Sequence, residues 1–92
     1  MAKFLMLGKY SVEAIKEITP ERTKKVTETI TQAGGKVNAM YALLGNYDLA
    51  FVVDFPGINE ALKASVAITK MTCIGFTTSA AISVEEFDKI SA

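Results

Sequence analysis

The fold of this chain is decided by residues 36–55, KVNAMYALLGNYDLAFVVDF. Two apolar runs, 36–44 and 48–55, flank the triplet Gly45-Asn46-Tyr47. Glycine and asparagine tolerate the positive φ angles that tight hairpin turns require. The stretch therefore predicts a β-hairpin in which Gly45 and Asn46 form a two-residue loop and Leu44 pairs with Tyr47.

Side-chain alternation along such a hairpin separates its residues into two faces. One face would carry Met40, Ala42, Leu44, Tyr47, Leu49, Phe51, Val53 and Phe55, which suit a core beneath helices. The other would carry Val37, Ala39, Tyr41, Leu43, Asp48, Ala50, Val52 and Asp54, and is mostly apolar. A three-residue loop with a bulge would move Asp48 to the helix-covered face, because one residue of slip exchanges the faces.

The segment before the hairpin predicts a strand followed by a helix. Residues 3–9 contain the apolar run FLML, which is typical of a buried strand. Thr19 and Pro20 are an N-cap and a proline at the first helical position, where the missing N–H costs nothing. Gly34-Gly35 can adopt the left-handed conformation that ends a helix.

The segment after the hairpin predicts a second helix, a last strand and a short terminal helix. Apolar residues recur at helical spacing from Pro56-Gly57 to about Met71, and residues 76–83 are rich in threonine and alanine. Val84, Phe87 and Ile90 mark the terminal helix. The order βαββαβ predicts an α+β, ferredoxin-like two-layer sandwich with both main helices on one face of the sheet, formed by residues 1–92 as a single domain.

The uncovered face of that sheet predicts self-association. Half of the 92 residues are hydrophobic and only 22% are charged, which is a rich apolar content for so short a chain. Covering apolar area gains roughly 25 cal/mol per Å², enough over a sheet face to exceed the entropy lost on association. We therefore expect a homodimer through the open sheet face, or a larger assembly.

Composition excludes several classes of function. The chain has no histidine, which removes histidine-based triads, histidine-ligated haem and the usual zinc sites, so neither a cofactor nor a metal is expected. Ten basic residues balance ten acidic ones without clustering, which argues against a nucleic-acid partner.

The run Met1–Leu7 is too short to be a signal peptide or a membrane span. The single cysteine, Cys73, indicates a cytoplasmic protein with a buried, inert thiol.

The tetrad Gly45-Asn46-Tyr47-Asp48 resembles the Gly-x-Tyr-Asp element of the GYD family of small bacterial and archaeal proteins. Further segments resemble that family in the same order, namely Leu7-Gly8-Lys9-Tyr10-Ser11, Gly34-Gly35-Lys36-Val37, Pro56 and Glu85-Glu86-Phe87. The resemblance covers nearly the whole chain. It implies a ferredoxin-like fold of the dimeric α/β-barrel type and no established activity.

Asp48 is the candidate catalytic residue. Between Tyr41, Leu43 and Ala50 on a covered face its carboxylate would lose water, which would raise its pKa toward that of a general base. Tyr41 or Tyr10 would then donate a hydrogen bond to a developing oxyanion. The simpler and favoured interpretation is that Asp48 accepts hydrogen bonds from backbone N–H groups of its own turn.

Lys9, Tyr10, Asn46 and Tyr47 are candidate ligand-binding residues around the hairpin loop. The hydroxyls of Tyr10 and Tyr47 would face a ligand, or the two rings would fill apolar space. For Tyr47 the second interpretation is favoured. Lys9 and Arg22 would hold an anion near the strand end, although isolated surface cations are usually solvated.

Three functions are compatible with these residues. The favoured one is a homo-oligomeric domain that binds a small apolar or weakly polar molecule between the sheet face and the loops, since the open face has few polar groups. The second is a structural subunit that docks onto a larger complex. The third is a cofactor-free isomerase or monooxygenase-like enzyme with Asp48 as base.

Overall fold

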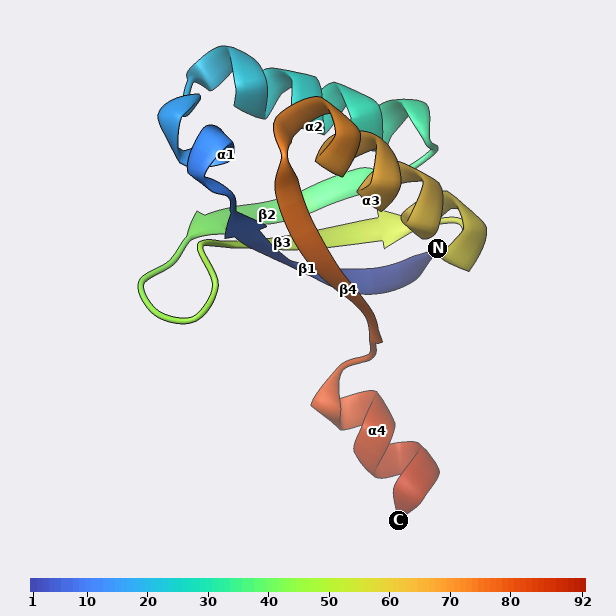
Figure 1. The fold of residues 1–92 in the computed structure, drawn as a ribbon. Coiled ribbons are helices and arrows are strands. Elements are labelled where there is room, and N and C mark those ends of the chain that lie inside the picture. Colours follow the sequence, from blue (N-terminus) through green and yellow to red (C-terminus); the bar gives the residue numbers. More distant parts are fainter.

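The computed structural model describes residues 1–92 as a four-stranded antiparallel sheet with helices on one face (Figure 1). The elements are β1 (Ala2–Tyr10), α1 (Val12–Lys16), α2 (Pro20–Gln32), β2 (Lys36–Ala42), β3 (Leu49–Phe55), α3 (Ile58–Thr72), β4 (Ile74–Ala81) and α4 (Val84–Ser91). The strands lie in the order β2-β3-β1-β4. Figure 1 shows α2 and α3 on the same side of the sheet and the other side bare. The predicted ferredoxin-like α+β fold is confirmed.

The helix boundaries follow the local signals in the sequence. The hydroxyl of Thr19 accepts a hydrogen bond from the backbone N–H of Arg22 at 3.1 Å, and Pro20 is the first residue of α2. The helix ends before Gly34, whose φ of 85° only glycine adopts without strain. A polar cap and a glycine stop therefore determine the length of α2.

The core lies between the sheet and the two main helices. It contains Phe4, Met6, Val26, Ile30, Phe51, Val53, Phe55, Ala61, Ala64 and Ile68. Gly8 lies on the same face of β1, and a Cβ there would be 2.8 Å from Cε1 of Phe76 and 3.2 Å from Cβ of Leu49. The glycine in β1 is thus required by the close approach of the Phe76 ring.

The predicted register of the hairpin is confirmed next to the loop and wrong at the start of β2. Ala42 pairs with Leu49 and Tyr41 with Ala50, as the face assignment requires. A bulge between Val37 and Ala39 then adds one residue to β2. Val37 therefore pairs with Val53 and packs against the core, not on the open face, because an extra residue exchanges the faces.

The predicted two-residue loop is also wrong. The backbone N–H of Leu43 donates to the carbonyl of Asp48 at 2.8 Å, but the ladder goes no further and residues 44–47 form a wider loop. Leu44 is fully exposed, and Tyr47 is half-buried outside the core cluster, so neither fills the core. The hairpin opens because the backbone N–H of Asp48 donates to β1 instead of to β2.

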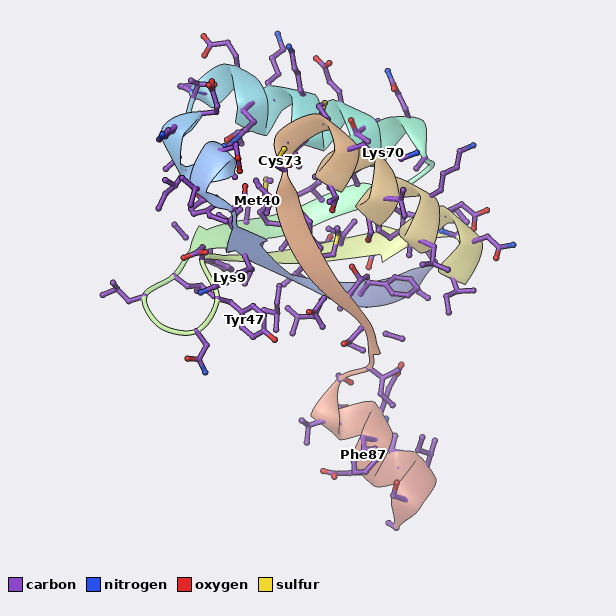
Figure 2. All side chains as sticks on the ribbon, viewed as in Figure 1. Lys9, Met40, Tyr47, Lys70, Cys73 and Phe87 are labelled. Carbon is purple, nitrogen blue, oxygen red and sulfur yellow. The ribbon has the colours of Figure 1, made fainter.

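Cys73 is exposed at the C-terminal end of α3, not buried as the sequence predicted (Figure 2). Its φ of 61° is the left-handed conformation, and its N–H donates to the carbonyl of Thr69. A left-handed residue at this position closes a helix, and glycine is the usual choice. The residue therefore occupies a turn that its β-carbon disfavours.

We expect Cys73→Gly to raise the free energy of unfolding by about 0.5–1 kcal/mol, because glycine removes the steric cost of positive φ but adds chain entropy to the unfolded state. Urea denaturation measures the change. Cys73→Ala is the matched control, since it removes the thiol and keeps the β-carbon. An equal gain in both variants would show that the thiol, not the backbone, is responsible.

Candidate functional site

The hairpin loop is fastened to the end of β1 by three hydrogen bonds. The N–H of Asp48 donates to the carbonyl of Gly8, and the N–H of Tyr10 donates to Oδ2 of Asp48, both at 2.8 Å. Nζ of Lys9 donates to the carbonyl of Asn46, also at 2.8 Å. We call this set of five residues, Gly8, Lys9, Tyr10, Asn46 and Asp48, the loop junction.

The position of Asp48 follows from where the sheet ladder ends. Pairing between β1 and β3 stops at Gly8 and Leu49, whereas pairing between β1 and β4 continues to Tyr10 and Ile74. The N–H of Tyr10 therefore has no partner strand on the β3 side. The carboxylate of Asp48 supplies the missing acceptor, and hydrogen bonds to a charged acceptor are among the stronger ones.

A cavity of about 150 Å³ lies beside the loop junction, between the sheet on one side and Ile18 and α2 on the other. We call it the loop-end cavity. It is lined by Tyr10, Ile18, Arg22, Thr23, Val26, Met40, Tyr41, Ala42, Leu49, Phe51 and Ile74. Figure 2 shows Met40 between the sheet and the helices, at this end of the molecule. The walls are largely apolar, with a single charged group.

That charged group is Arg22, the only arginine of the chain. Its guanidinium carbon lies 5.4 Å from the centre of the Tyr10 ring, within the range of a cation–π contact. Nη1 donates to the carbonyl of Ala14, in the middle of the short helix α1. A guanidinium has five N–H donors, so further donors remain after this bond. The side chain is thus held in place while keeping capacity to bind an acceptor.

The model of the GYD domain family matches residues 4–91. This chain belongs to the GYD domain family. No curated protein sequence matches this chain.

Among solved structures, the domain is similar to the crystal structure of the Mycobacterium tuberculosis leucine response regulatory protein, with a TM-score of 0.59 and 7% sequence identity. The match covers 89% of this chain and 51% of that chain. The GYD domain therefore spans about half the length of the solved structure that it matches. At this identity the likeness shows the fold alone.

The structure brings four of the six predicted site residues together. Lys9, Tyr10, Asn46 and Asp48 meet at the loop junction, and Tyr10 also lines the loop-end cavity. Tyr41 lines the cavity from the edge strand β2 and is 59% exposed. Tyr47 points to the side of the sheet away from the helices (Figure 2).

Asp48 does accept a backbone hydrogen bond, as the simpler interpretation predicted, but not from its own turn. Its partner is Tyr10, 38 residues earlier in the chain. The carboxylate is therefore engaged in holding the loop, and its role as a catalytic base stays a prediction. The sequence favoured a solvated surface position for Arg22, but its guanidinium lies over the ring of Tyr10. This contact joins two segments that no short-range pattern connects.

The GYD domain has a second, larger hollow. A groove of about 470 Å³ between α3 and β4 is lined by Phe4, Ile58, Ala61, Leu62, Ser65, Val66, Thr69, Lys70, Phe76, Thr78 and Ala80. We call it the α3–β4 groove. It shares no residue with the loop junction, and its only charged lining residue is Lys70. For a small polar ligand the loop-end cavity offers the better anchored polar group.

The open sheet face is apolar in its middle and charged at one margin. Nζ of Lys3 lies 3.2 Å from Oδ1 of Asp54. The Asn38 amide and the Lys3 ammonium beside Asp54 hold the pKa of that carboxyl below its usual value.

No three acidic or cysteine side chains of the domain gather in a way that could hold a metal ion. None of its helices has the length and apolar character needed to cross a membrane.

Removing the carboxylate of Asp48 tests the loop junction. We expect Asp48→Ala to lower the free energy of unfolding by about 1–3 kcal/mol, because the N–H of Tyr10 loses its acceptor. Asp48→Asn keeps an acceptor oxygen, and its loss is expected to be smaller. Chemical denaturation measures both, and amide hydrogen exchange reports faster exchange at Tyr10 in the alanine variant.

Glu28→Ala is the control for that measurement, since Glu28 is exposed on α2 and its carboxylate makes no hydrogen bond. Equal losses for Asp48→Ala and Glu28→Ala would contradict a structural role for the junction.

Proposed function

We propose that this GYD domain is a homodimeric binding module that holds a small molecule in the loop-end cavity. The ligand has an apolar, ring-sized body and one acidic or polar end. The observation that carries the proposal is an apolar cavity with the only arginine of the chain fixed at its wall.

The size of the cavity limits the ligand. An apolar protein cavity of about 150 Å³ can accommodate a molecule the size of benzene. The walls come from all four strands, from Ile18 and from α2, so an apolar body there would be removed from water on most sides. Burial of apolar area at roughly 25 cal/mol per Å² supplies the affinity for such a body.

Arg22 supplies orientation and selectivity. Guanidinium groups bind carboxylates through two parallel hydrogen bonds, which an ammonium group cannot match in geometry. The ring of Tyr10 and the carbonyl of Ala14 hold the arginine before a ligand arrives. Less side-chain entropy is then lost on binding, which favours an acidic group on the ligand.

The loop junction connects this cavity to the loop that carries Asn46 and Tyr47. Tyr10 has its ring at the cavity and its backbone N–H on the carboxylate of Asp48. A ligand that moves Tyr10 would therefore change the hydrogen bond that holds the loop. The name of the protein with a similar fold describes a response to leucine, and this supports a small-molecule role only by analogy of fold.

Dimer formation is proposed through the open sheet face. Its central residues, Leu5, Leu7, Ala39, Ala50 and Val52, are half-buried in the single chain, and both main helices lie on the opposite side. The pair Lys3 and Asp54 borders this apolar area. An apolar face with a charged margin is the usual composition of a protein interface.

Phenylacetate and benzoate are suitable probes of the cavity, with toluene as the neutral comparison. We expect the carboxylates to raise the melting temperature, and Arg22→Gln to weaken their binding about 10- to 100-fold, because a charged hydrogen bond is lost. Lys24→Gln on the same helix is the control. Toluene binding is expected to be equal in both variants. No stabilisation by either carboxylate would contradict the proposed cavity.

Val52→Lys tests the sheet interface, because it places a charge in the middle of the apolar face. We expect it to halve the sedimenting mass of the assembly in analytical ultracentrifugation. The control is Val12→Lys, since Val12 is 69% exposed on α1 and lies outside the sheet. Equal masses for the wild-type chain and the Val52→Lys variant would overturn the sheet-to-sheet dimer.

A further inference from the structure

The helix α4 has an apolar face that nothing covers. Figure 1 shows α4 projecting from the end of β4, away from the sheet and from the other helices. Val84 and Ile90 are each 74% exposed and Phe87 is 55% exposed (Figure 2). The spacing i, i+3, i+6 places these three residues on one side of the helix. An exposed aromatic between two exposed aliphatic residues favours an interaction site.

A helix of eight residues is not stable by itself. Isolated helices shorter than about 12–15 residues are marginal in water. The local support of α4 consists of the Ser83 cap, which accepts from the N–H of Glu86 at 3.1 Å, and an exposed ion pair between Lys89 and Glu85 at 3.6 Å. Because the family match includes α4, the helix is part of the domain and not an appended tail. Its apolar face therefore needs a partner surface.

The α3–β4 groove is an unfilled apolar surface of matching size. Ile58, Leu62 and Val66 follow each other at i, i+4 and i+8 along α3 and are 67%, 59% and 50% exposed. The helix α3 has 15 residues and α4 has eight, so at 1.5 Å per residue α4 fits within the groove. The rings of Phe4 and Phe76 line the groove and would meet Phe87 there.

The charges around the two surfaces are complementary. Lys70 lines the groove, and Lys63 lies beside it on the same exposed side of α3. The helix α4 carries Glu85, Glu86 and Asp88 next to its apolar residues. Opposite charges at the margin of an apolar contact determine orientation and suppress wrong partners.

From these surfaces we infer that α4 of one chain docks into the α3–β4 groove of a second copy of the same chain. Only Ile82 and Ser83 separate β4 from α4, and the helix leaves the domain in the direction away from its own groove. The long axis of the molecule, 47 Å against 30 and 18 Å, includes this arm. Exchange of a terminal element between identical chains is a common way to form an oligomer.

This interface is separate from the proposed sheet-to-sheet dimer, because it uses the helix side of the domain. Reciprocal α4 exchange together with the sheet interface makes a tetramer. We expect Phe87→Glu alone and Val52→Lys alone each to halve the sedimenting mass, and the double variant to be monomeric. If Val52→Lys has no effect while Phe87→Glu does, α4 exchange survives and the sheet dimer fails. If Phe87→Glu leaves the mass unchanged, α4 exchange is overturned.

Disulfide trapping identifies the docking surface directly. Cys73→Ser is introduced first, since Cys73 is exposed and would react. One preparation then carries Val66→Cys, and a second, labelled with ¹⁵N, carries Ile90→Cys. After mixing and mild oxidation, we expect a disulfide between a labelled and an unlabelled chain, found by mass spectrometry, in at least about tenfold excess over the control because docking raises the effective concentration.

The control replaces Val66→Cys by Lys24→Cys, on an exposed position of α2 outside the groove. Yields equal to that control overturn the inference. A chain that carries both Val66→Cys and Ile90→Cys tests the remaining arrangement. A disulfide that forms within one such chain at high dilution would show that α4 folds back into its own groove, which also overturns docking on a second copy.

Discussion

The hydrogen bond from the backbone N–H of Tyr10 to the carboxylate of Asp48 is the contact on which this end of the molecule depends. This bond gives an acceptor to the N–H of Tyr10, which lies past the last residue pair between β1 and β3. It holds the hairpin loop against β1 instead of letting the hairpin close on itself. It also positions the Tyr10 ring at the loop-end cavity, beneath the guanidinium of Arg22.

The domain is too small to bury all of its apolar residues by itself. Only 14 of its 92 residues are buried, and the rest include the open sheet face and the apolar face of α4. A chain of this length has much surface for its volume, so we expect association to cover its apolar excess. The proposed sheet dimer and the α4 exchange are two consequences of this single constraint.

Charge distinguishes the loop-end cavity from the α3–β4 groove. The loop-end cavity has a guanidinium held by an aromatic ring and a carbonyl, which suits a small ligand with an acidic end. The α3–β4 groove is larger, with a lysine among its mostly apolar walls and a second lysine beside it, which suits the apolar face of an acidic helix. The same fold thus has a proposed ligand site at one place and a proposed protein-docking site at another.

The sequence by itself determined what depends on neighbouring residues. The N-cap and proline that start α2, the glycine that ends it and the register of β2 and β3 next to the loop are all local, because they arise from backbone preferences over a few positions. The tertiary structure alone decided the bulge that moves Val37 into the core, the exposure of Cys73 and the partner of Asp48. These features depend on segments far apart in the chain, whose distance and direction no local pattern contains.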